Sequence, residues 1–315
     1  MRIIGRFAPV LTAVTVAFVL AGCGSGPSQV SSAAIVGQHA IPLDEVQQEI
    51  RWLLANVPAA QDLAEQRKFD NFSRKIVQER VIHELLLIAA EREGLQADPA
   101  EVTQLIESSG GTEEAAKLVG VEPDRVRELA ADQILLQQLG EKYVPRLSVD
   151  VVGAVVTGES PGSTAEDRAL ALGEQIAAAP ERAPELVAGD GRQVIDQQLA
   201  LSELLGSDSA ALAASALFGV APGTVVVIQP NPQQGAAWLV ALVRDRKVGT
   251  AGEEPGQADP QTLYNIGLRM LAPIAREAGV RINPRYGVWD QAGMTVAADE
   301  RDFAGHLIPA RTVRP

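Results

Sequence analysis

Histidine and cysteine, the residues that most often bind transition metals or act as catalytic bases and nucleophiles, are scarce in this 315-residue chain. They are His39, His83, His306 and Cys23. One Cys cannot form an intramolecular disulfide, and the four residues lack the spacing of a zinc motif. The three scattered histidines give no local sign of a Ser-His-Asp arrangement, and no phosphate-binding loop is recognisable. The sequence therefore predicts no metal site, no cofactor and no active site.

The composition predicts folded domains rather than a disordered chain. Hydrophobic residues make up 46% of the sequence and charged residues 21%, close to the values of globular proteins. The formal net charge of −13 has the wrong sign for a protein that binds nucleic acid through its phosphates. We therefore expect no nucleic-acid partner.

The N-terminus predicts export and a lipid anchor. Residues 1–22 form a signal peptide, with Arg2 and Arg6 ahead of an apolar run that ends in Leu-Ala-Gly before Cys23. This ending resembles the lipobox of bacterial lipoproteins, which implies a diacylated Cys23 as the mature N-terminus. A membrane-spanning anchor is the alternative, but the run is short for the roughly 20 residues that a spanning helix needs. We expect an extracytoplasmic protein anchored to the cell membrane, with residues 23–34 as a flexible tether.

Residues 35–147 read as a helical domain that follows one short strand, expected over residues 35–41. Apolar residues at intervals of three and four begin at Leu43 and predict an amphipathic helix. A longer helix is expected from about Asp62 to Arg92, where Gly94 follows as a stop signal. Shorter helices are expected after Asp98-Pro99, Thr112 and Glu122-Pro123.

The order of these elements, together with three strings, carries a family resemblance. The strings are Pro-Leu-Asp-Glu-Val at 42–46, Leu-Leu-Leu-Ile-Ala-Ala-Glu-Arg-Glu-Gly-Leu at 85–95 and Ala-Asp-Pro-Ala-Glu-Val at 97–102. This part of the chain resembles the N-terminal domain of SurA- and PrsA-type extracytoplasmic chaperones. The resemblance implies a helical cradle that binds unfolded or extended polypeptide.

Residues 148–249 predict a small α+β domain with the order β-α-α-β-α-β-β. The expected elements are strands at 149–156, 193–201, 225–228 and 236–243, and helices at 164–178, 183–187 and 208–218. With Phe218 followed by Pro222-Gly223-Thr224-Val225, this segment resembles a parvulin-type peptidyl-prolyl isomerase domain. The family's two histidines are missing from the expected strands, and all three histidines of the chain are expected outside this domain. We therefore expect a degenerate domain without catalytic activity.

The C-terminal part is expected to return to the helical domain. Residues 250–260 have the composition of a linker, and 261–297 predict a helix, kinked near Pro273, followed by a strand. The string Asn-Pro-Arg-Tyr-Gly-Val-Trp-Asp at 283–290 resembles the ending of actinobacterial SurA-like lipoproteins. We expect Tyr286 and Trp289 to cap the helical core, with an external aromatic contact site as the alternative. Residues 298–315 are expected to be a loose tail.

These expectations combine into an α+β protein: an all-helical N-terminal chaperone domain completed by a C-terminal helix, plus a small parvulin-like α+β domain. The leading hypothesis is a lipid-tethered chaperone that binds unfolded or extended secreted polypeptides. Trp52, Phe69 and Phe72 are the candidate client contacts, because aromatic side chains offer much apolar area to varied ligands. The alternatives are an active isomerase with a non-standard pocket and a non-catalytic lipoprotein that binds one dedicated partner.

Overall fold

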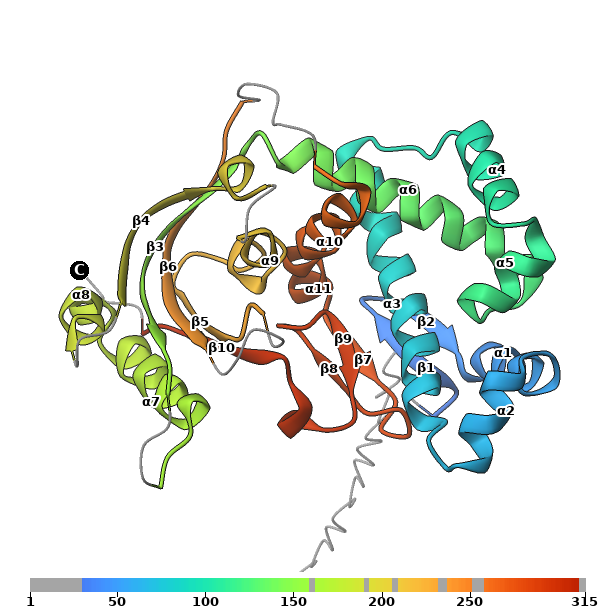
Figure 1. The fold of residues 1–315 in the computed structure, drawn as a ribbon, viewed down its shortest axis with the longest axis horizontal. Coiled ribbons are helices and arrows are strands. Elements are labelled where there is room, and N and C mark those ends of the chain that lie inside the picture. Colours follow the sequence, from blue (N-terminus) through green and yellow to red (C-terminus); the bar gives the residue numbers. More distant parts are fainter. Residues whose placement is uncertain are drawn as a thin grey trace, which may run out of the picture.

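The computed structural model describes residues 30–158, 162–189, 193–205, 209–231, 237–250 and 258–311. The expected signal peptide, Cys23 and most of the expected linker lie outside these residues. Within the described parts, no helix is long and apolar enough to cross a membrane. The fold combines a helical region with a curved antiparallel sheet, as the α+β prediction required (Figure 1).

A three-stranded sheet brings the two ends of the helical region together. Its order is β2-β1-β7, formed by β1 (Ser32–Val36), β2 (His39–Pro42) and β7 (Val280–Ile282). The single strand expected at 35–41 is instead a hairpin, because Gly37 takes a left-handed φ of 60° and turns the chain. The tether prediction is wrong for residues 32–34, which belong to β1 and are buried.

The helical region contains α1 (Leu43–Asn56), α2 (Pro58–Glu65), α3 (Asp70–Glu93), α4 (Pro99–Ser108), α5 (Thr112–Val119) and α6 (Val126–Tyr143). Two helix ends lie where the sequence predicts them. The Asp98 side chain caps the start of α4, and Gly94 ends α3 in the left-handed conformation. The single helix expected from Asp62 to Arg92 is wrong. Arg67, with a φ of 58°, separates α2 from α3 and redirects the chain.

The five-stranded sheet has the order β10-β5-β6-β3-β4, with antiparallel neighbours. Its strands are β3 (Leu147–Val156), β4 (Gln193–Ala200), β5 (Thr224–Ile228), β6 (Trp238–Val248) and β10 (Gly305–Pro309). The helices α7 (Ala165–Ala178) and α8 (Ala183–Val187) cover one face (Figure 1). The expected helix at 208–218 shortens to α9 (Ala210–Ala213) and the 3-10 turn η5 (Ala216–Phe218).

The two faces of this sheet belong to two different cores. Val152, Val227 and Val240 pack with α7 and α8 in a small core. Alternate residues of the same strands, such as Val151, Val226 and Val243, join a large core that also contains side chains of α1, α3 and α6. The inner face of the sheet is therefore continuous with the interior of the helical region.

Two C-terminal helices link these regions. They are α10 (Pro260–Met270) and α11 (Ala272–Ala278), which are separated at Leu271, close to the expected kink at Pro273. A Cβ atom on Gly267 would lie 1.9 Å from the Leu136 carbonyl oxygen, so α10 meets α6 through backbone contact. A hairpin of β8 (Val288–Asp290) and β9 (Thr295–Ala297) follows β7, and β9 packs near α3.

The prediction of a loose tail is wrong for residues 305–309. They form β10 and pair with β5, so that His306 stands opposite Val227 at the edge of the five-stranded sheet. The expectation that all three histidines lie outside this region is wrong for the same reason. Short strands with little periodicity, such as Gly-His-Leu-Ile-Pro, are recognisable only from the edge to which they bind.

Candidate functional site

A groove of about 480 Å³ opens between α3, α5, α6 and α10. Its apolar lining consists of Ile82, Leu118, Val119, Leu129, Leu136, Tyr264 and Leu268. These side chains come from four helices, of which α10 lies more than a hundred residues further along the chain than the other three. The groove therefore exists only because α10 returns from the C-terminal part to pack on α6.

The short helix α5 supplies the most exposed apolar side chains beside this groove. Leu118 is 77% exposed and Val119 40% exposed. The same helix packs inward through Ala115 and Ala116, which are buried in a small core with α4 and α6. Exposed apolar side chains next to an apolar hollow are typical of a site that binds another molecule. We name this groove, with its lining residues, the α5 groove.

Polar side chains line the rest of the α5 groove: Lys75, Gln78, Glu79, Asp132, Gln133, Gln137 and Gln261. Glutamine amides donate and accept hydrogen bonds, so they suit the backbone of an extended peptide without selecting its sequence. Burial raises the pKa of Glu79, although the nearby Lys75 and Arg125 oppose this effect. The groove combines apolar contact with adaptable hydrogen bonding.

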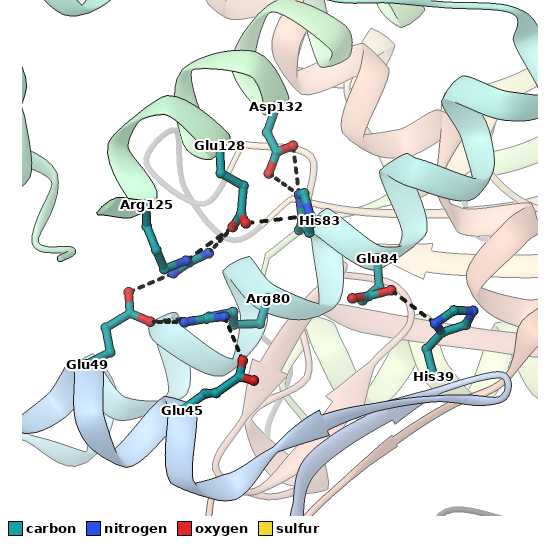
Figure 2. Close-up of polar contacts among 9 residues, drawn as sticks. All are labelled: His39, Glu45, Glu49, Arg80, His83, Glu84, Arg125, Glu128 and Asp132. Atoms are coloured by element: carbon teal, nitrogen blue, oxygen red, sulfur yellow. Dashed lines mark hydrogen bonds and ion pairs between the residues drawn. The ribbon is translucent and has the colours of Figure 1, made fainter. Parts of the chain in front are cut away.

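A buried network of charged side chains lies beneath the groove and joins α1, α3 and α6 (Figure 2). The carboxylate of Glu49 is 0% exposed and lies 3.0 Å from Arg80 Nη2 and 2.6 Å from Arg125 Nη1. Arg125 also donates to Glu128, with its Nη2 2.7 Å from Oε1. The two arginines offset the cost of burying the charge of Glu49, whereas burying the carboxylate or an arginine without its partner would cost much free energy.

His83 extends this network to the wall of the groove. Its Nδ1 lies 2.9 Å from both carboxylate oxygens of Asp132, and its Nε2 lies 3.7 Å from Glu128 Oε2 (Figure 2). Burial lowers the pKa of His83, but the hydrogen bond that its ring donates to Asp132 and the charges of Asp132, Glu128 and Glu84 outweigh burial and raise that pKa overall. Burial raises the pKa of Asp132 as well, so this pair holds a proton readily.

The donor atoms of His83, Glu128 and Asp132 all lie within 4.8 Å of one another, close enough to suggest a metal site. The carboxylates of Asp132 and Glu128 face opposite nitrogens of the His83 ring, and Glu128 also forms an ion pair with Arg125. A metal ion would need one ring nitrogen together with both carboxylates. The arrangement fits a protonated histidine between two acids better than a metal centre.

The structure does not bring the three aromatic residues predicted as client contacts into the α5 groove. Phe69 and Phe72 stack on each other with ring centroids 5.7 Å apart, and Phe72 lies against Gly120. Phe69 lines a separate hollow with Arg285 and Tyr286. Trp52 is half-buried and packs between two cores. Their role as client contacts stays a prediction.

The C-terminal aromatic residues occupy the positions expected of core residues. Tyr286 is 5% exposed and belongs to the large core, where its hydroxyl has no hydrogen-bond partner among the described residues. The Trp289 ring donates from Nε1 to Gln291 over 3.1 Å. Arg285 makes no ion pair with the parts of the chain that the structure describes.

Sequence reasoning missed the groove residues on α5 and α10. Leu118 and Val119 end a short helix whose inward face carries only alanines, so their periodicity indicated nothing unusual. Tyr264 and Leu268 lie about 130 positions from the α6 residues that they join in the groove. The prediction of no local sign of a Ser-His-Asp arrangement assumed that the chain has no Gly-x-Ser-x-Gly string, which is wrong, because residues 158–162 read Gly-Glu-Ser-Pro-Gly. Ser160 lies outside the described residues.

A comparison with protein-family models matches residues 7–140 to the SurA-like N-terminal domain. None of the curated proteins compared matches the chain. The matched segment includes β1, β2 and the helices up to α6, which together provide α3, α5 and most of α6 for the groove wall. Residues 7–140, which make up less than half of the chain, therefore match a SurA-like N-terminal domain.

Proposed function

We propose that this protein is a membrane-tethered extracytoplasmic chaperone that holds unfolded or extended segments of secreted polypeptides in the α5 groove. The observation that carries the proposal is the exposure of Leu118 and Val119 beside the apolar floor of that groove. The match to a SurA-like domain supports unfolded polypeptide as the ligand, and the apolar lining of the groove supports binding through apolar side chains.

The contacts proposed between the α5 groove and its clients are individually weak and not specific for sequence. Burying apolar surface contributes roughly 25 cal/mol per Å², without direction, so many different clients satisfy the same groove. The glutamine side chains at its edge accept any backbone register. We therefore expect broad and reversible binding of client segments rich in apolar residues.

Membrane tethering is part of the same proposal. It is supported by the Leu-Ala-Gly-Cys string at 20–23, with lipid attached to Cys23. Two acyl chains suffice for a stable anchor, since each buried CH₂ contributes about 0.8 kcal/mol. Mass spectrometry of the N-terminal peptide, isolated from cells that export the protein, tests this step. An unmodified Cys23 in the membrane-bound protein would contradict it.

The isomerase alternative is disfavoured by the position of Phe218. Phe218, which carries part of the parvulin resemblance, is 0% exposed and belongs to the large core. Its carbonyl oxygen accepts a hydrogen bond from Arg246 at 2.9 Å. A prolyl peptide therefore has no access to that ring in this arrangement.

The test measures light scattering from a chemically unfolded client that is diluted into the full chain in nanodiscs. Leu118→Glu with Val119→Glu is expected to abolish suppression of aggregation, because the charges oppose apolar binding. Leu87→Glu is the matched control, since Leu87 is 48% exposed on α3 but does not line the groove. Equal suppression by both variants would reject the groove. A lack of suppression by the unmodified protein would favour one dedicated partner instead.

A further inference from the structure

A second pocket, separate from the α5 groove, lies where α10 and α11 meet η5, β5 and β10. Its volume is about 440 Å³, within the range of small-ligand sites. It is lined by Ala216, Gly219, Val220, Pro222, Gly223, Thr224, Arg269, Ala272, Arg276, Gln291, Leu307 and Pro309. We name it the Arg276 pocket. Most of its wall is apolar, and among the described residues that line it the charged side chains are two arginines.

Arg269 forms the buried side of this pocket. Its guanidinium donates to two backbone carbonyls, those of Ala214 and Ala292, the second over 2.7 Å. No ion pair joins it to a carboxylate among the described residues, and burial lowers its pKa although Asp290 opposes this effect. The carbonyls hold the side chain in place, and Asp290 acts on its charge without forming an ion pair among the described residues.

Arg276 forms the exposed side. Its side chain makes no ion pair or hydrogen bond with the described parts of the chain. Nearby, Arg246 donates to the Phe218 carbonyl, and burial together with the charge of Arg276 lowers the pKa of Arg246. No residue in the pocket wall is acidic, although the whole chain has a net charge of −13. This wall is therefore a local cationic site in an acidic protein.

We propose that the Arg276 pocket binds the C-terminal carboxylate of an extended polypeptide, with the apolar last side chain seated against Val220 and Leu307. We choose a carboxylate as the ligand because its negative charge complements the arginines of the pocket, and because a carboxylate can accept hydrogen bonds from an arginine guanidinium. The apolar wall of the pocket favours an apolar side chain on the residue that bears this carboxylate. A free fatty acid has the same two features, and the selection of a polypeptide rests on the proposed chaperone function.

This site would give the protein a second kind of contact with its clients. The α5 groove would bind apolar segments anywhere in a chain, whereas the Arg276 pocket would bind only a free chain end. The two sites are formed by different residues, so each can be removed without the other. A client held at both would gain from the high effective concentration of the second contact.

The test uses fluorescence anisotropy with the full chain in nanodiscs. The probes are a fluorescent decapeptide that ends in Val-Leu with a free carboxylate and the same peptide with a C-terminal amide. The acid is expected to bind at least tenfold more tightly than the amide. Arg276→Gln should remove this difference, and Arg276→Lys should keep part of it. Arg281→Gln, an exposed arginine on β7 outside the pocket, is the matched control.

Three results would overturn the proposal. They are equal binding of acid and amide, an acid preference that survives Arg276→Gln, and binding of decanoate without any binding of the peptide acid. Failure of this site is distinguishable from failure of the α5 groove. Leu118→Glu should abolish suppression of aggregation and leave the acid preference intact, whereas Arg276→Gln should have the opposite pair of effects.

Discussion

The Nδ1 atom of His83 on α3 lies 2.9 Å from both carboxylate oxygens of Asp132 on α6. Asp132 also lines the α5 groove, so this hydrogen bond sets the spacing of two groove walls. On the other side of the ring, Nε2 faces Glu128 over 3.7 Å. A proton on Nε2 makes that contact attractive, and its loss leaves a lone pair opposite a carboxylate.

We predict that the protein is most stable below the usual His pKa of 6.5 and loses stability as the pH rises beyond it. Because the fold raises the pKa of His83, the protonated ring stabilises the folded state, and this contribution disappears as the pH passes the folded-state value. Urea unfolding between pH 6 and pH 8.5 measures the effect.

His83→Gln should flatten that pH profile, and His39→Gln should leave it unchanged. His39 is the suitable control because its side chain is 73% exposed and lies 3.8 Å from Glu84. A profile that stays steep in His83→Gln would assign the pH dependence to another group.

A second prediction concerns the centre of the charged network. Glu49→Gln should lower the free energy of unfolding by about 3–5 kcal/mol, because it removes the carboxylate from two buried arginine contacts. Glu45→Gln is the control, since the Glu45 side chain is 52% exposed and contacts only Arg80, for which we expect about 0–1 kcal/mol. Equal losses for the two variants in urea titrations would contradict the buried role of Glu49.

A third prediction concerns the contact between α6 and α10. Gly267→Ala places a methyl group 1.9 Å from the Leu136 carbonyl oxygen, so the helices must separate. We expect a loss of about 1–3 kcal/mol in stability, together with weaker client binding, because both helices line the α5 groove. Gly249→Ala is the control, since its nearest neighbour would be 3.8 Å away. A Gly267→Ala protein with unchanged melting would show that the contact is adaptable.

A fourth prediction concerns β10. A chain that ends at Ala304 lacks this strand and exposes the edge of β5 along residues 224–228. We expect a lower melting temperature and aggregation through that edge, because unpaired strand edges bind other chains. A chain that ends at Arg311 keeps β10 and serves as the control. Equal melting and solubility of the two truncations would mean that β10 contributes little to the sheet.

A fifth prediction separates packing from binding at Phe72. Phe72→Ala should lower stability by about 2 kcal/mol through the loss of the stack with Phe69, without changing client affinity of the folded protein. Isothermal titration with an unfolded client, at a temperature where the variant remains folded, measures this. Lost affinity in the folded variant would support Phe72 as a client contact, and unchanged affinity would contradict that role.

The sequence alone determined the features that depend on local chemistry. Residues such as Asp98 and Gly94 marked helix ends because a cap or a left-handed turn needs only its neighbours. The α+β class and the SurA-like N-terminal domain followed from the order of these elements, and the family comparison agrees. The sequence did not predict the break between α2 and α3, because nothing in it distinguishes the left-handed Arg67 from an ordinary helical arginine.

Tertiary structure decided everything that depends on distant partners. The strand at 305–309 forms because β5 offers it an open edge, and residues 32–34 leave the expected tether because β7 pairs with β1. The α5 groove requires Leu118, Leu136 and Tyr264 to meet across more than a hundred residues. Periodicity shows which side of a helix is apolar, but only packing decides whether that side is covered or left open to a ligand.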